Sequence, residues 1–244
     1  MAKAAPAEQI RLLDLQALDG RAKNLAVQAK TLRADPRLVR LQAELDAARS
    51  AHGQITIELA DAQAELKRAE GDVEQVVNRI DRDEARLNAG GLSKDLMALQ
   101  SDLASLAKRR SDLEDAELEV MERLEEITGR QSVQAAVVDK AATALAAVQE
   151  EIDAQLASIK AEQETVQGQR AELAASFEAA LLSVYEKTLE RRGIGAARLF
   201  HGTSEGSGMQ LSPGDLADIS KAAAEDIVFC PDSGCILVRS ADWS

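Results

Sequence analysis

Apolar residues recur along much of the chain at alternating spacings of three and four, the pattern of helices that pack in coiled coils. Residues 37–88 carry one such series, in which only His52 and Asp83 are polar. Its members are Leu38, Leu41, Leu45, Ala48, His52, Ile55, Leu59, Ala62, Leu66, Ala69, Val73, Val76, Ile80, Asp83 and Leu87. The series predicts a long helix with a single buried seam.

A second seam follows a break at Asn88-Ala89-Gly90-Gly91, where Ser93 can cap a new helix. This seam begins at Leu96 and extends to Ile159, with polar residues at a minority of its positions. A short connection with glycine between two long seams predicts an antiparallel helical hairpin with its tip near residue 90. Pairing symmetric about that tip would place Leu66 near residue 115 and Leu45 near residue 136.

Further helices are expected on either side of the hairpin. Asp35-Pro36 separates residues 7–34, an amphipathic stretch whose apolar stripe includes Ile10 and Leu25. This helix has about the length needed to accompany the longer hairpin arm, residues 93–167. Gly168 allows another break, after which residues 170–192 read as a helix that buries Phe177, Leu181, Val184, Tyr185 and Leu189.

The character of the chain changes at Gly193. Residues 193–244 are rich in glycine and contain both cysteines and the only tryptophan. Short strands are predicted at 196–200, 209–211, 227–230 and 236–239, with one helix over 213–223 capped by Ser212. We therefore expect a mainly α protein: a helical coiled-coil hairpin domain over 1–192 and a small C-terminal α+β domain over 193–244.

The amino-acid composition agrees with this interpretation and disfavours some classes of function. The chain has 244 residues, a net charge of −13 and 2% aromatic residues, which is typical of long helices and unusual for a compact globular core. The acidic excess counts against nonspecific binding to DNA or to anionic membranes. No apolar run is long enough for a membrane span or a signal core, and two cysteines suggest a reducing compartment. A soluble cytoplasmic protein is expected.

Three stretches resemble the bacterial C4-type zinc-ribbon proteins that carry a long N-terminal coiled coil. They are LLDLQALD (12–19), the arm DLMALQSDLASLAKRRSDLEDAELEVMERLEE (95–126), and the tail LSPGDLADI…DIVFCPDSGCILVR. The tail is the specific part, because coiled-coil sequences converge easily. The resemblance implies a zinc-ribbon-like fold for residues 193–244 and nucleic-acid or transcription-related partners.

The resemblance also implies where zinc ligands would stand. In such proteins one Cys-x-x-Cys pair precedes the Leu-Ser-Pro helix, and a second lies in a Cys-Pro-x-Cys-Gly-x-Ile-Leu stretch. These positions fall here on Ser204, Ser207, Cys230 and Ser233, and Cys235 occupies the variable position after the glycine. A serine hydroxyl is a poor replacement for a thiolate on zinc. The favoured interpretation is a degenerate ribbon that folds without metal through an apolar core, with Cys230 at least partly buried.

A rewired zinc site is the alternative. Cys230, Cys235 and His201 are suitable zinc ligands, and Glu205, Asp232 or water could supply a fourth. Each of these residues also has an ordinary structural explanation: Cys230 as a small buried side chain, Cys235 as a turn or strand residue, and His201 as a polar strand end.

No pattern of an enzyme is present, because no convincing pair of catalytic carboxylates and no Ser/His/Asp set emerges. We expect a non-enzymatic adapter whose hairpin presents the ribbon-like domain to a protein partner. One alternative is an RNA- or DNA-binding regulator that uses the ribbon or basic coil patches at 79–86 and 108–110. Another is a structural spacer. The ribbon-like domain has three basic residues against seven acids, which disfavours nucleic acid there.

Overall fold

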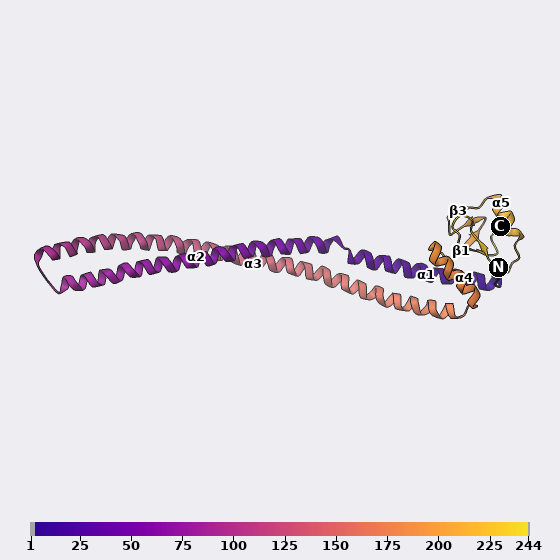
Figure 1. Cartoon of the computed structure of the whole chain (residues 1–244), viewed down its shortest axis with the longest axis horizontal. Helices are drawn as coiled ribbons and strands as arrows, with labels where there is room; N and C mark the ends of the chain where they lie inside the picture. Colours follow the sequence, from indigo (N-terminus) through magenta and orange to yellow (C-terminus); the bar gives the residue numbers. More distant parts are fainter. Residues whose placement is uncertain (1–2, 244) are drawn as a thin grey trace. The chain divides into compact units, whose positions relative to one another are not determined.

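The computed structural model describes residues 3–243 (Figure 1). Its elements are α1 (Pro6–Arg33), α2 (Pro36–Asn88), α3 (Ser93–Ala175), α4 (Ala179–Arg192), β1 (Ala196–Phe200), β2 (Thr203–Ser204), β3 (Met209–Gln210), α5 (Pro213–Lys221), β4 (Val228–Phe229) and β5 (Ile236–Arg239). The predicted fold class is confirmed: a long helical hairpin is combined with a small module of strands and one helix. None of the helices in residues 3–243 has the length and apolar character of a membrane span.

Contacts divide the chain into two compact units. One comprises the chain up to Asp35 and from Glu151 onward, and the other is Pro36–Glu150. The division predicted at residue 192 falls inside the first of these, where it marks the change from helices to strands.

The second unit is the hairpin of α2 and the first part of α3 (Figure 1). Every position of the predicted seam on α2 is buried or half-buried, so the heptad interpretation is confirmed. Asp83, the acidic residue in that seam, is only 8% exposed. Its carboxylate lies 3.6 Å from Arg79 and 3.7 Å from Arg86, which compensates for the burial of its charge.

The pairing of the two arms differs from the symmetric register. Arg123 binds Glu65 at 3.0 Å and Arg130 binds Glu58 at 3.0 Å, so residue 115 is not the neighbour of Leu66. The arms are displaced by about one to two helical turns. The cause lies at the tip, where α3 begins beyond the end of α2 (Figure 1) and Met97 is 69% exposed.

In the first unit, α1 packs beside the last part of α3 and beside α4. The face that α1 buries is centred on Leu12 and Leu15, both 0% exposed, whereas Ile10 is 46% exposed. The predicted stripe was therefore wrong at Ile10, because the strands as well as α3 determine which face of α1 is covered.

The break expected at Gly168 is also wrong. Helix α3 continues through Gly168 to Ala175, and the chain turns at 176–178, where Phe177 is buried. A glycine inside a helix costs only about 1 kcal/mol. Burial of Val166, which is 1% exposed, favours continuation of the helix.

The strands form one sheet in the order β3-β2-β1-β5-β4. Strands β1 and β5 are parallel, and the other neighbours are antiparallel. The predicted strands at 196–200 and 236–239 are confirmed, while the two-residue β2 was not predicted. Helix α5 begins as expected, with the Ser212 hydroxyl accepting a hydrogen bond from the Asp215 N–H.

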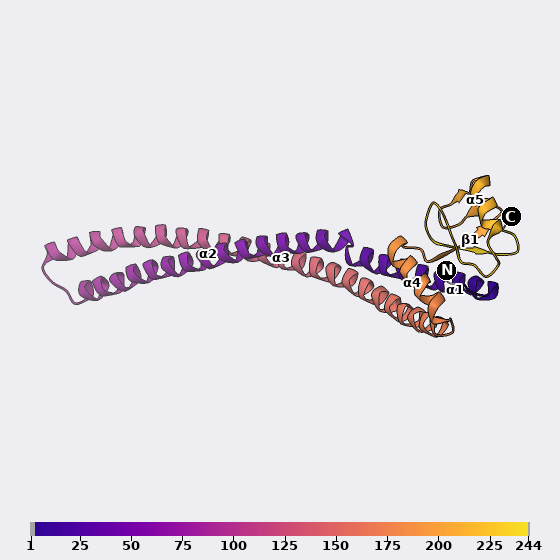
Figure 2. The same cartoon turned by 45° about the vertical axis from the view of Figure 1, so that its right-hand side comes forward.

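Both faces of the sheet are covered. Helices α1 and α4 lie on one face (Figure 2), where Ile236 and Val238 contribute to their apolar cluster. Leu237 points to the opposite face, which packs on α5 and includes both cysteines. Three large apolar side chains of the sheet are exposed: Phe200 by 39%, Met209 by 58% and Phe229 by 48%.

Candidate functional site

The two cysteines lie at the turn between β4 and β5. The Cys230 N–H donates to the Cys235 carbonyl at 2.8 Å, and the Gly234 N–H donates to the Cys230 carbonyl at 2.9 Å. Gly234 has a φ of 72°, a left-handed conformation that glycine adopts without a steric penalty. Cys230 is 2% exposed and Cys235 is 0% exposed, so the predicted burial of Cys230 is confirmed.

Serine hydroxyls surround the thiols. The Ser233 hydroxyl donates to Cys235 Sγ at 3.1 Å, and the Ser233 N–H approaches Cys230 Sγ at 3.5 Å. The Ser204 hydroxyl is completely buried and has no hydrogen-bond partner of good geometry among residues 3–243. It nevertheless lies close enough to Cys230 to stabilise the thiolate.

This environment shifts the pKa values of the two thiols in opposite directions. Burial by itself would raise the pKa of Cys230, but interactions with Ser204, Ser233 and the backbone of Asp232 outweigh it, and its pKa lies below the ordinary value of a cysteine. Burial and the neighbouring Cys230 raise the pKa of Cys235 despite its hydrogen bond from Ser233.

The other proposed ligand positions have local structural roles. The Ser207 hydroxyl accepts a hydrogen bond from the Met209 N–H at 3.3 Å. His201 is exposed in the turn after β1, with a φ of 47° and its ring 4.2 Å from that of Phe200. Glu205 is exposed, as is Asp232.

The donors present do not fit a four-coordinate structural zinc. Two thiols stand beside hydroxyls at three of the four expected ligand positions, and hydroxyls are weak zinc ligands. Within residues 3–243, no group of three or more histidine, cysteine, aspartate or glutamate side chains could hold a metal ion. The structure therefore does not bring His201 or an acidic residue to the cysteines.

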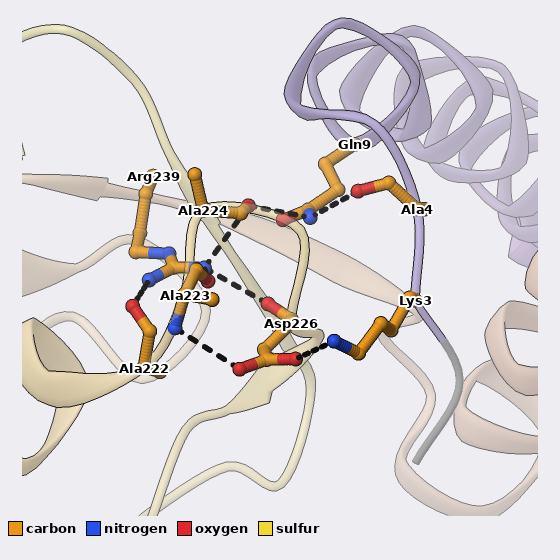
Figure 3. Close-up of polar contacts among 8 residues, drawn as sticks. All are labelled: Lys3, Ala4, Gln9, Ala222, Ala223, Ala224, Asp226 and Arg239. Carbon is orange, nitrogen blue, oxygen red and sulfur yellow. Dashed lines mark hydrogen bonds and ion pairs between the residues drawn. The ribbon is translucent and has the colours of Figure 1, made fainter.

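A second feature of the module is the environment of Arg239, which follows the buried run of β5. Its guanidinium donates to the backbone carbonyl oxygens of Ala222, Ala223, Ala224 and Asp226 at distances from 2.6 to 3.2 Å (Figure 3). A longer contact of 3.5 Å joins it to the Ile219 carbonyl. Carbonyl groups at a helix end lack intrahelical partners, and a guanidinium can satisfy several of them. Arg239 therefore binds the backbone of its own module.

The segment that Arg239 organises also contacts the start of α1 (Figure 3). The buried Gln9 amide donates to the Ala224 carbonyl at 3.1 Å and to the Ala4 carbonyl at 2.9 Å. The Lys3 ammonium lies 3.6 Å from the Asp226 carboxylate. These contacts attach residues 224–226 of the strand module to the beginning of α1 and the residues just before it.

The LLDLQALD stretch supplies another attachment. Its Gln16 side-chain oxygen accepts from the Gly195 N–H at 2.7 Å, and its Asp19 carboxylate accepts from Tyr185 at 2.7 Å and from Arg170 at 2.6 Å. Burial and the hydrogen bond to Asp19 raise the pKa of Tyr185. The sequence pattern predicted this stretch as part of the helix over 7–34 and carried a family resemblance, but it predicted no role for Gln16 or Asp19. The signal that could have indicated their role is that Gln16 and Asp19, both polar, lie three positions apart on the helix beside the buried Leu12 and Leu15.

The lysine and arginine side chains of the strand module, residues 193–243, each contact another group of the same module. Arg198 lies 3.1 Å from Asp242 and over the ring of Phe200, and Lys221 lies 2.7 Å from Asp218. Arg239 is held by carbonyl groups as described above. These contacts disfavour a phosphate-binding surface on the module.

Comparison with known proteins matches both parts of the chain. Residues 15–193 match the CT398-like coiled coil hairpin domain, and residues 203–237 match the C4-type zinc ribbon domain. Both are non-catalytic kinds of domain. The second family is described as C4-type, whereas the matched range of this chain contains two cysteines, Cys230 and Cys235.

Relatives share nearly the whole length. An uncharacterized protein of Mycobacterium tuberculosis is 34% identical over 238 residues, which cover 97% of each chain. One from Mycobacterium leprae is 26% identical over 220 residues, covering 90% of this chain and 95% of the relative.

Solved structures agree in fold. A structure from Mycobacterium smegmatis has a TM-score of 0.85 at 31% identity and covers 97% of this chain and 100% of its own. CT398 from Chlamydia trachomatis, at 20% identity, has a TM-score of 0.64 and covers 95% of this chain and 97% of its own, a likeness of fold alone. The chain belongs to the CT398-like coiled-coil hairpin family.

Proposed function

We propose that this protein is a non-enzymatic adapter, in which the hairpin and the ribbon-like module together serve a protein partner. The observation that carries the proposal is the use of the module's basic residues, Arg198, Lys221 and Arg239, for internal contacts. A surface that binds nucleic acid needs free cations for phosphate groups. This module instead leaves large apolar side chains exposed.

The exposed apolar residues of the module are Phe200, Met209 and Phe229. Aromatic residues and methionine are enriched in protein–protein interfaces, where they provide contact area at low entropic cost. Phe229 and Met209 lie on β4 and β3, the two opposite edge strands of the sheet, and neither belongs to the buried apolar clusters. They are therefore the residues that we expect a partner to bury.

Point variants of the full-length chain test this proposal better than deletion of residues 193–244. Deletion would uncover Leu12, Leu15 and Tyr185, which pack against the strands, and would create an artificial apolar surface. Phe229→Ser and Met209→Ser remove exposed groups only. Val39→Ser, at a residue that is 75% exposed on the hairpin, is the matched control.

The variants should be compared as bait in affinity purification with nuclease treatment. We expect a protein that wild type and Val39→Ser retain and that Phe229→Ser or Met209→Ser loses. Binding of RNA that weakens steeply with salt would instead support the nucleic-acid alternative and direct attention to Lys108 and Arg109 on α3. Unchanged binding in all variants would overturn the proposed surface.

We also propose that the module folds without zinc. Its apolar clusters support this, since they bury both cysteines and cover both faces of the sheet. The hydrogen bonds of Arg239, Gln9 and Gln16 add support, because they fix residues 222–226 and the start of β1. Elemental analysis of untagged protein tests it. Stoichiometric zinc that is lost together with the module's structure after mutation of His201 or Cys235 would contradict it.

A further inference from the structure

The position of the two cysteines opposite one another in the β4–β5 hairpin has a chemical consequence. Val228 pairs with Leu237 and Phe229 pairs with Ile236, so the next position of the ladder places Cys230 opposite Cys235. The hydrogen bond from the Cys230 N–H to the Cys235 carbonyl, 2.8 Å long, agrees with this register. Directly opposed residues have Cβ atoms about 4.5–5.5 Å apart.

A disulfide requires Cα atoms about 4.4–6.8 Å apart, a range that includes cross-strand neighbours. The movement that brings the two cysteine side chains to bonding distance is made by the turn rather than by the strands. The Cys235 N–H is directed to the Ser233 hydroxyl at 3.4 Å, and exposed Pro231 and Asp232 lie in the turn. The ladder thus ends at this pair, and the turn can close the short distance between sulfur atoms.

The surroundings favour a bond within the chain over other products. Both thiols are free and buried, and the chain has no further cysteine. A second copy of the protein cannot easily reach a sulfur with so little exposed surface. Around Cys235 the packing is close: a Cβ added at Gly206 would lie 2.7 Å from its sulfur. A small oxidant has better access to such a site than a bulky disulfide reagent.

We propose that Cys230 and Cys235 form a reversible intrachain disulfide when the protein encounters a peroxide. One thiolate attacks the peroxide O–O bond and becomes a sulfenic acid, with release of water when the oxidant is hydrogen peroxide. The second thiol displaces hydroxide from that sulfur, and the S–S bond forms with release of another water. Two thiols are oxidised and one peroxide is reduced, and a dithiol reductant reverses the change.

The bond would connect β4 to β5 at the place where a zinc ribbon has its second ligand pair. Because Cys230 and Cys235 belong to the apolar cluster that Trp243 adjoins, the closed turn should stabilise that side of the sheet. The proposal is independent of the adapter function, since it concerns the chemistry of the turn and no partner.

The disulfide can be tested on the full-length wild-type protein. The protein should be treated with hydrogen peroxide, denatured in a thiol-alkylating reagent, and digested with trypsin. Both cysteines fall in one tryptic peptide, residues 222–239. We expect this peptide to lose the mass of two hydrogen atoms and to resist alkylation, and dithiothreitol to restore both thiols. The oxidised protein should also show a higher urea midpoint in its Trp243 fluorescence.

Two other results would overturn the proposal. Oxidised wild type that runs as a covalent dimer on a non-reducing gel would show that the thiols bond between chains. Peptides carrying only sulfinic or sulfonic acid would show that the second thiol does not reach the first. Cys230→Ser and Cys235→Ser serve as matched controls, in which the peptide should never lose two hydrogen atoms. The decisive measurement on wild type does not depend on how well these variants fold.

Discussion

At the scale of single residues, Arg239 shows how one side chain replaces several others. Its guanidinium serves one carbonyl group of α5 and four of the segment after it, and the Asp226 carboxylate adds a hydrogen bond from the Ala223 N–H. That same segment receives Gln9 from α1. The order of the segment therefore depends on one residue at the end of β5.

Arg239→Lys should destabilise the module, because an ammonium group cannot reproduce the planar fork of five donors. Hydrogen bonds to charged groups contribute about 1.5–3 kcal/mol each, so we expect a loss of about 2–3 kcal/mol. The measurement is the urea midpoint of Trp243 fluorescence. Arg191→Lys, at an exposed position at the end of α4, is the control and should leave the midpoint unchanged. Equal midpoints for the two variants would refute this role of Arg239.

Tyr185 gives a prediction about pH. Burial and the hydrogen bond to Asp19 raise its pKa, so the folded protein holds the phenolic proton more tightly than the unfolded chain. This contribution to stability is fully present below the ordinary tyrosine pKa of about 10 and is lost as the pH rises above it. The urea midpoint should therefore decline between about pH 9 and pH 11.

Tyr185→Phe separates this effect from the titration of other groups. The variant lacks the ionisable proton but keeps the ring, so its midpoint should start lower at neutral pH and decline less at alkaline pH. Parallel pH curves for wild type and variant would mean that Tyr185 does not contribute to the alkaline loss.

The residues of the candidate site were predictable only where a local sequence pattern indicates them. The assignment of Ser204, Ser207 and Ser233 as degenerate ligand positions is what the resemblance of the tail to C4-type zinc ribbons implies, and it stays a prediction. The role of Arg239 was not predictable, because it depends on a fold that brings residues 222–226 back to β5. The engagement of Gln16 with Gly195 spans an even longer stretch of chain.

At the scale of elements, the long helices were predictable because heptad spacing is a local property of the sequence. The pairing of the arms was not, since it depends on how 89–92 cross from one helix to the other. The end of α3 was also missed. There, burial of Val166 and Ala174 outweighs the low helix propensity of Gly168.

Gly168→Ala tests that explanation. Nothing lies within 4 Å of a Cβ added at Gly168, and the position is helical, so alanine should stabilise the first unit by up to about 1 kcal/mol. Gly193→Ala is the contrasting variant: Gly193 ends α4 with a φ of 75°, where alanine should cost about 1 kcal/mol. Thermal unfolding followed by circular dichroism measures both. A destabilised Gly168→Ala protein would indicate that the helix needs flexibility at this point.

At the scale of the whole molecule, distant parts of the sequence share one core. Leu12 and Leu15 from α1 lie in the same apolar cluster as Ile236 and Val238 from β5. The ribbon-like module therefore does not have an independent core on that face, although a family boundary lies between residues 193 and 203. Stability of the C-terminal strands should respond to changes near the N-terminus.

Leu15→Ala should lower the stability reported by Trp243 by about 2–5 kcal/mol, the usual cost of truncating a fully buried leucine. Ile10→Ala changes a residue on the same helix that is 46% exposed and should alter stability by less than about 0.5 kcal/mol. Urea titration of both variants gives the comparison. If Trp243 reports the same midpoint in Leu15→Ala and wild type, the strands are stable without α1.

The shared core of α1 and β5 also imposes an order on biosynthesis. The ribosome releases Leu12 and Leu15 long before Ile236 and Val238, with the entire hairpin of Pro36–Glu150 made in between. At about 5–20 residues per second, the nascent α1 exposes its apolar face for on the order of ten seconds or more. The hairpin has its own buried seam and can fold during this interval. The first unit can close only after β5 emerges, so a chain interrupted before that point leaves an apolar surface open to chaperones and proteases.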